Sequence, residues 1–318
     1  MKVAVLGSSL FARTAAAQLS RAGNDVVRFG GAGEKLRRLA GCFPRLRAAL
    51  PEARFEPIPF LSRLPFRDRV ALAKLPALGR IASPTFASAS DYETVDQWLD
   101  RLYQSPAARR NFWAPLVQQI AHGGLHNSSA KMIEVVAKPA LLARTDNESL
   151  AIPLDDLDEL SPSPSPSIGR ACAASIDVEE LRLGALTLES GEMIRFDLIV
   201  SALSAEGLLK LLPRTVGETE PYFRALGRLS DTRPHAPGCE AFRPRVQSPI
   251  EGLLVIGPHV RTGLPMNAES AMRSIEEIAP LAARVGESKA AAVASPPHTP
   301  GFVPLGRLKP VTPANSNP

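Results

Sequence analysis

The chain has 318 residues, of which 45% are hydrophobic, 22% charged and only 5% aromatic, with a formal net charge of +5. This length is enough for one large or two ordinary domains with a hydrophobic core, and the composition is typical of a globular protein. Few aromatic residues and dispersed arginines argue against a nucleic-acid partner, because stacking platforms and dense basic patches are missing.

The first 29 residues, MKVAVLGSSLFARTAAAQLSRAGNDVVRF, predict a strand, a tight turn, a helix and a second strand. Residues 3–6 form the short apolar run of a buried parallel strand. Residues 10–21 have an alanine-rich helical pattern that Gly23 ends, and residues 25–29 give the second strand. This spacing is typical of a Rossmann-like βαβ unit, in which the helix N-terminus is directed at a ligand phosphate.

Helical patterns dominate the next part of the chain. They cover residues 34–39, 67–75 and 94–119, the last broken at Ser105–Pro106, and continue over residues 131–144. We therefore predict a helical cap or substrate region over residues 41–160.

Strand patterns return after a low-complexity segment. SPSPSPS at 161–167 predicts a Pro/Ser-rich linker over residues 161–184. Residues 185–203 alternate like a hairpin with a turn at Ser190–Gly191 and then become a buried strand. LLVIG at 253–257 predicts another buried strand, followed by a loop and a helix over residues 267–284. Residues 286–318 are rich in Pro, Ala and Ser and predict a disordered tail.

These elements predict an α/β fold with a discontinuous dinucleotide-binding domain, formed by residues 1–40 and 185–285. The phosphate-binding turn of such a domain has small residues at three places, which are here Gly7, Ser9 and Ala12. Ser9 puts a side chain where the diphosphate would approach. Gly30 stands where an acidic residue would bind the ribose. From the turn alone, two interpretations stay open: a dinucleotide site, or a βαβ unit kept as scaffold.

The stretch SPIEGLLVIGPHVRTGLPMNAESAMRSI at 248–275 resembles the closing motif of FAD-dependent desaturases in the amine oxidase and phytoene desaturase superfamily. The best match is the squalene-associated desaturase group, also called hydroxysqualene dehydroxylases. The residues that stand at the motif positions are Gly257, Thr262, Gly263, Leu264, Pro265, Glu269 and Ala271.

Three further stretches resemble the same family in the same order: residues 94–130, 197–213 and 233–244. The resemblance implies a Rossmann-like FAD/NAD(P)-binding domain and bound FAD. It also implies an oxidoreductase that acts on a squalene-like, apolar isoprenoid in hopanoid or carotenoid biosynthesis. In such proteins the flavin carries the chemistry, and the protein orients the substrate.

The chain departs from the family pattern mainly at the cofactor. Ser9 and Gly30 replace two expected contacts, and Pro258 replaces the carboxylate that should follow Gly257. The chain also looks internally shortened. A non-catalytic homologue that has lost tight FAD binding is therefore the alternative. A weaker option is a nicotinamide enzyme in which Arg28 accepts a 2′-phosphate.

No acid–base pair emerges from the spacing, and no catalytic residue is assigned. Of the histidines, His259 is the one whose loop should face the flavin ring.

The cysteines and the apolar runs give the expected location. Cys42, Cys172 and Cys239 are scattered without metal-ligand spacing, which predicts reduced thiols and no metal site. No signal peptide and no run of about 18 apolar residues is present. We therefore expect a cytoplasmic protein, for which peripheral contact with an anionic inner membrane surface stays open.

Overall fold

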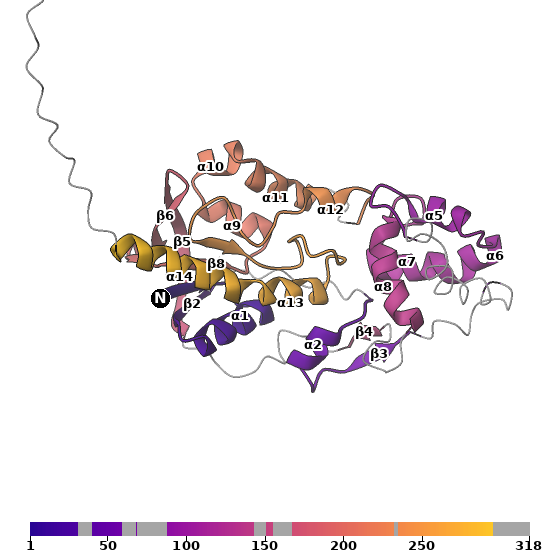
Figure 1. The fold of residues 1–318 in the computed structure, drawn as a ribbon, viewed down its shortest axis with the longest axis horizontal. Helices are drawn as coiled ribbons and strands as arrows, with labels where there is room; N and C mark the ends of the chain where they lie inside the picture. Colours follow the sequence, from indigo (N-terminus) through magenta and orange to yellow (C-terminus); the bar gives the residue numbers. More distant parts are fainter. Residues whose placement is uncertain are drawn as a thin grey trace, which may run out of the picture.

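The structure, a computed structural model, describes residues 1–30, 40–58, 68, 88–142, 151–154, 167–231 and 235–294. Figure 1 shows two lobes, one built around a β-sheet and the other made of helices. The helices predicted at 34–39 and 67–75 and residues 161–166 of the Pro/Ser run lie outside the described residues, apart from the single residue Asp68.

The sheet lobe holds seven strands in the order β7-β6-β5-β2-β1-β8-β9. Its parallel part contains β1, β2, β8 and β9, with β5 parallel to β2, and β5, β6 and β7 form an antiparallel meander. The prediction of a Rossmann-like α/β fold is confirmed. The bounds are β1 Lys2–Leu6, β2 Asp25–Gly30, β5 Ser167–Glu179, β6 Arg182–Leu188, β7 Met193–Arg195, β8 Leu198–Ser201 and β9 Leu253–Val255.

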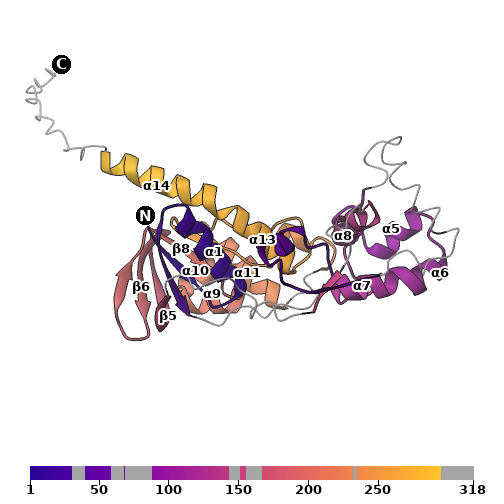
Figure 2. The same ribbon diagram turned by 90° about the horizontal axis from the view of Figure 1, so that it is seen from below.

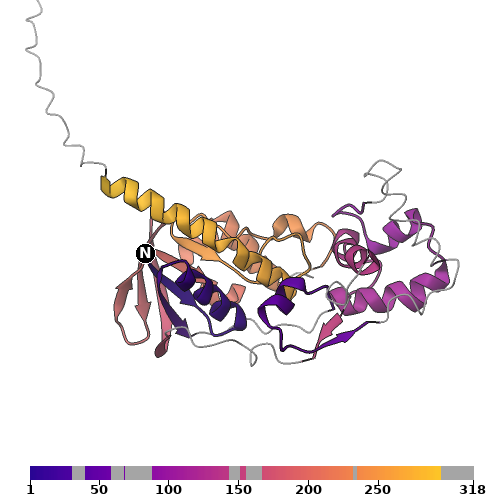
Figure 3. The ribbon, with the colours of Figure 1, turned by 60° about the horizontal axis from the view of Figure 1, so that its bottom comes forward.

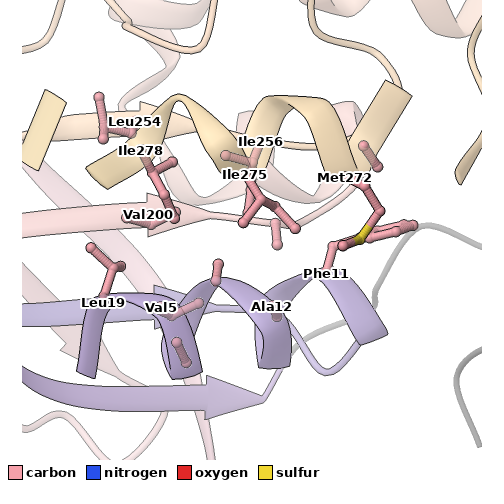
Figure 4. Packing of buried hydrophobic residues seen from close by; sticks show 14 of the residues in the cluster. Val5, Phe11, Ala12, Leu19, Val200, Leu254, Ile256, Met272, Ile275 and Ile278 are labelled. Carbon is pink, nitrogen blue, oxygen red and sulfur yellow. The ribbon is translucent and has the colours of Figure 1, made fainter. Parts of the chain in front are cut away.

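Helices cover both faces of this sheet because successive strand residues point to opposite sides. Val3 and Val5 of β1 face α1 (Leu10–Arg21), α13 (Ala268–Glu276) and α14 (Ile278–Ala294), whereas Ala4 and Leu6 face α9 (Ala205–Leu211) and α11 (Pro221–Asp231). Figure 4 shows the first of these layers, in which Phe11 of α1 points toward Met272 of α13. Figures 2 and 3 show α13 and α14 running along the same side as α1.

The helical lobe has a separate core. It contains α5 (Val95–Arg101), α6 (Pro106–Ala108), a π-helical turn (Arg109–Trp113), α7 (Ala114–Ala121) and α8 (Ala130–Leu142). Helix α5 begins with a capping box, in which Thr94 and Gln97 exchange side-chain and backbone hydrogen bonds. The buried rings of Trp98 and Trp113 meet edge to face with centroids 5.6 Å apart. These aromatic contacts fix α5 against the segment that ends in α7.

Five smaller elements lie outside these two cores or beside them. The antiparallel pair β3 (Phe55–Pro57) and β4 (Ala151–Pro153) and the short helix α2 (Pro44–Ala49) fall within the region predicted as a helical cap. Leu46 of α2 packs in the sheet-lobe core with α13. The remaining two are α10 (Arg214–Thr219), beside α9 and α11, and α12 (Cys239–Phe242).

Two sequence predictions are wrong in part. The linker predicted for residues 161–184 ends by residue 167, because β5 and the start of β6 occupy residues 167–179 and 182–184 and continue the sheet. The disordered tail predicted from residue 286 begins too early, because α14 continues to Ala294. Alanine-rich residues 289–294 favour the helix, and the prolines that would end it come only afterwards. Residues 295–318 lie outside the described ranges.

Candidate functional site

The turn after β1 lies where the strand order of the sheet reverses. From β1 the chain crosses to β2 on one side, while β8 pairs with β1 on the other, so the carboxyl ends of β1 and β8 form the switch point at which open α/β sheets bind ligands. Gly7 follows β1 with φ +126°, and its N–H donates to the Phe29 carbonyl at 3.0 Å. A Cβ at Gly7 would lie 3.2 Å from the Ala202 oxygen and 3.4 Å from the Ala12 Cβ. The turn therefore requires glycine here and a small residue at Ala12.

Ser9 is the N-cap of α1. Its Oγ accepts a long hydrogen bond, 3.5 Å, from the Ala12 N–H, and the residue is 3% exposed. The sequence analysis placed the Ser9 side chain in the path of a diphosphate. In the structure the hydroxyl lies over the first turn of α1, where it accepts from a backbone N–H that a diphosphate would otherwise use.

The end of β2 is basic. Burial, with the charge of nearby Arg13 adding to it, lowers the pKa of Arg28 from its ordinary value. One buried guanidinium nitrogen of Arg28, Nη1, makes no hydrogen bond. Gly30 closes the strand without a side chain. One guanidinium nitrogen at the end of β2 is therefore without a hydrogen bond, beside Arg13 of α1, and β2 itself presents no carboxylate beyond Asp25 at its start.

The loop after β9, residues 257–266, is called here the closing loop. Gly257 begins it with φ +139°, and its N–H donates to the Ser274 Oγ at 3.0 Å. A Cβ at Gly257 would lie 2.8 Å from Cε1 of His259, whose buried imidazole packs over the glycine. The space that a glycine leaves beside a strand end is thus filled by a side chain of the same loop.

Arg243 anchors the closing loop through hydrogen bonds to its backbone carbonyls. Its side chain is fully buried, and it donates to the Pro258 carbonyl, to the Leu264 carbonyl at 2.5 Å and to the Ser270 Oγ at 3.0 Å. It also pairs with Glu240 at 2.6 Å. Burial lowers the pKa of Arg243 and the Glu240 carboxylate opposes this, so the guanidinium stays charged. Arg243 was not among the predicted site residues, although it stands with Glu240 at helical spacing within residues 233–244.

The other predicted residues of the loop are held by the same network. The Gly263 N–H donates to the second Glu240 oxygen at 2.8 Å, and Thr262 shares a 2.6 Å hydrogen bond with Ser270. The Pro265 carbonyl accepts from the N–H of Asn267, which caps α13 through its side chain. Leu264 and Pro265 therefore contribute their backbone carbonyls, which accept hydrogen bonds and fix the shape of the closing loop.

Glu269 faces α2. Its carboxylate accepts hydrogen bonds from the backbone N–H groups of Arg45 at 3.2 Å and Leu46 at 3.1 Å and pairs with the Arg45 guanidinium at 3.0 Å. Burial raises the pKa of Glu269, although these donors act in the opposite sense. These contacts clamp α2 to α13. The prediction that Glu269 binds a cofactor stays a prediction.

The segment 235–243 connects both lobes to the closing loop. The His235 carbonyl accepts from the Ser129 N–H and the Asp91 carbonyl accepts from the Gly238 N–H, each at 2.7 Å. On the other side, His235 Nε2 accepts from the Met266 N–H at 3.1 Å. Predicted residues of the turn and of the closing loop therefore gather at the carboxyl edge of one sheet, and the helical lobe is tied to that edge.

Two general findings concern the described residues only. Within the described ranges, no three His, Cys, Asp or Glu side chains are grouped closely enough to hold a metal ion. None of the described helices combines the length and apolar composition needed to cross a bilayer.

Comparisons with known proteins identify the fold. No family model and no curated protein matches the sequence. Among solved structures, an oxidoreductase from Methanosarcina mazei is similar over 87% of this chain and 99% of its own, with a TM-score of 0.61 and 14% identity. A triple mutant of putrescine oxidase made to redesign cofactor binding is similar over 89% and 99%, with a TM-score of 0.54 and 10% identity.

Cyclohexylamine oxidase from Brevibacterium oxydans is similar over 91% of this chain and 99% of its own, with a TM-score of 0.54 and 14% identity. At these identities the likeness establishes the fold, which this chain shares with oxidases.

Proposed function

We propose that this chain is an FAD-dependent oxidoreductase of the desaturase or dehydroxylase type, acting on a squalene-like isoprenoid. The observation that carries the proposal is the turn from β1 into α1. Gly7, with its positive φ and crowded surroundings, and the N-terminus of α1 stand at the switch point of a sheet shared with oxidases. This is the place where a diphosphate binds in such sheets.

The residues present fit the diphosphate end of the cofactor. Backbone N–H groups after Gly7 and in the first turn of α1 would hold it, and Ala12 allows the turn and helix to pack closely. When bound, FAD supplies hydride transfer. The closing loop, held by Arg243, would shape the wall near the flavin.

The substrate class is the finer part of the proposal. It rests on the resemblance of residues 94–130 and 248–275 to squalene-associated desaturases. Support comes from the helical lobe, which is tied by Asp91 and Ser129 to the segment behind the closing loop. A lobe held in that way can cover a reacting apolar chain and exclude water.

A non-catalytic homologue is the second candidate, and specific observations favour it. Gly30 stands where the ribose-binding acid is expected, Pro258 provides neither a carboxylate nor an N–H, and His259 fills the space beside Gly257. Lost charge-assisted hydrogen bonds cost about 1.5–3 kcal/mol each, so several together would raise the FAD Kd by orders of magnitude.

The test is to purify the full chain and record its visible spectrum before and after equilibrium dialysis against FAD, with NADPH and NADH as comparison ligands. One flavin bound per chain would support the proposed enzyme, and squalene-type substrates would then be assayed. A folded, colourless protein that neither binds FAD nor gains stability from it refutes the enzyme and supports the second candidate. Tight NADPH binding without flavin would refute both.

Ser9→Gly sharpens this test. Glycine restores the small residue at the second position of the turn, and replacing a serine cap by glycine costs only a few tenths of a kcal/mol in helix stability. If FAD binds at this turn, its affinity should rise in the variant, because the competing hydroxyl is gone. The matched control is Ser204→Gly, which removes the corresponding N-cap of α9. It should leave FAD affinity unchanged.

A further inference from the structure

A cavity of about 520 Å³ lies between α11 and the segment 236–242. None of its lining residues belongs to the turn after β1 or to the closing loop. Figure 1 shows α12 next to the end of α11, on the side of the sheet lobe that faces the helical lobe. Pockets that bind small molecules commonly have volumes of about 300–1,000 Å³, so this cavity is large enough for one.

Helix α11 presents two different faces. Phe223 and Leu226 are fully buried and pack into the sheet-lobe core. The face toward the cavity carries Pro221, Arg224, Ala225, Arg228 and Leu229, which follow the i, i+3, i+4, i+7, i+8 spacing of one helix side. The cavity face is thus a continuous stripe in which two arginines alternate with apolar residues.

The opposite wall is apolar. Pro237, the buried Cys239 and the ring of Phe242 line it. Phe242 is 64% exposed. A ligand that filled the cavity with an apolar group would remove part of this ring from water, which is favourable at about 25 cal/mol per Å².

The charge of the cavity is uncompensated within the described residues. Arg224 and Arg228 are exposed, one helical turn apart, and neither forms an ion pair with a side chain that the structure describes, which leaves out Asp231 at the end of α11. Glu240, the acidic residue next to lining residue Cys239, uses one oxygen for Arg243 and the other for the Gly263 N–H. Glu218, near the start of α11, pairs with Arg214. Two guanidinium groups therefore remain to bind an anion.

We propose that this cavity binds an amphiphile with an anionic head, a phosphate or a carboxylate, and an apolar tail. Arg224 and Arg228 hold the head, and the tail lies along Ala225 and Leu229 against Pro237 and Phe242. Because Glu240 lies in the lining segment and Arg243 directly follows it, an occupied cavity stiffens the support of the closing loop. The site is separate from the proposed cofactor site, so its test does not depend on FAD.

The experiment is isothermal titration of the full chain with dodecyl phosphate, kept below the concentration at which it forms micelles. Inorganic phosphate supplies the head alone, and dodecyl maltoside supplies the tail with a neutral head. Dodecyl phosphate should bind one to one, and both comparison ligands should bind at least about tenfold more weakly. Equal binding of the neutral detergent would overturn the proposal, because the arginines would then contribute nothing.

The variants test the two halves of the site separately. Arg224→Gln with Arg228→Gln should weaken dodecyl phosphate binding about tenfold or more, whereas Arg195→Gln, on exposed β7 and outside the cavity, should not. Ala225→Trp should block the tail while leaving the arginines in place. Full-strength binding by either cavity variant refutes the assignment. Sedimentation with phosphatidic acid vesicles measures whether the protein binds a lipid surface instead. If the vesicles bind the protein but monomeric dodecyl phosphate does not, this face is a membrane contact and the ligand site is refuted.

Discussion

Arg243→Met tests whether one buried cation organises the closing loop. Methionine keeps much of the aliphatic volume but removes every donor. The native side chain donates to the Pro258 and Leu264 carbonyls and to Ser270 and pairs with Glu240. Leaving a buried acceptor without a donor costs about 1–3 kcal/mol, and breaking a buried ion pair costs about 3–5 kcal/mol. Because Leu264 is only half-buried and Glu240 keeps its bond to Gly263, we expect a total loss of about 3–5 kcal/mol.

Urea unfolding followed by far-UV circular dichroism measures the total loss, and hydrogen exchange locates it. Peptides from residues 257–267 should exchange faster in the variant, while peptides from residues 95–121 of the helical lobe should not change. Arg214→Met is the control, because it removes an equally long cation from an exposed pair and should leave the midpoint unmoved. A loss below about 1 kcal/mol with a protected loop would show that the network does not support the closing loop.

Three further predictions concern single residues. Gly7→Ala should lower the free energy of unfolding by about 2–3 kcal/mol, because it combines a disfavoured φ with contact to a backbone oxygen. Gly191→Ala is the control, because Gly191 has a φ of +84° but open space around it, and this variant should cost about 1 kcal/mol. Equal losses in urea unfolding would contradict the role of the crowded surroundings of Gly7. Burial raises the pKa of Cys239 to about 11, so at pH 8 only about one molecule in a thousand carries the thiolate. Mass spectrometry should find iodoacetamide alkylation at Cys239 at least tenfold slower than at half-buried Cys172, and comparable rates would refute this. Burial raises the pKa of Glu269, so the native state binds the Glu269 proton more tightly than the unfolded state does. The contribution of Glu269 to the free energy of unfolding should therefore fall as the pH rises from the ordinary glutamate pKa through the native one. In urea titrations at several pH values, Glu269→Gln should remove this pH dependence.

The sequence predicts well what local patterns determine. The unit formed by residues 1–30 follows from an apolar run, a helical alanine pattern and Gly23, and the hairpin turn at Ser190–Gly191 follows from turn chemistry. The sequence also predicts a helix that begins at Asn267, and in the structure the Asn267 side chain caps α13. Each of these signals depends on residues within one turn or strand of one another.

What the sequence could not predict depends on distant partners. The role of Arg243 requires Pro258 of the closing loop and Ser270 of α13, which follow it by 15 and 27 residues. Glu269 lies 224 residues from Arg45, so no spacing rule connects α13 with α2. Strand β5 follows a Pro/Ser run whose composition obscured its alternation, and only pairing with β2 and β6 makes that segment a strand.

The order of the strands has a consequence for how the chain folds during synthesis. Strand β1 lies between β2 and β8, and its partner residues in β8 follow almost two hundred positions later; the Lys2 N–H donates to Asp197, 195 residues away. The first unit must therefore leave the ribosome with the β1 edge and the β2 edge unpaired, because β5 and β8 come later, while most of the helical-lobe core lies within residues 88–142 and can pack early. An exposed, apolar strand edge that stays unpaired in this way is a site for misassembly.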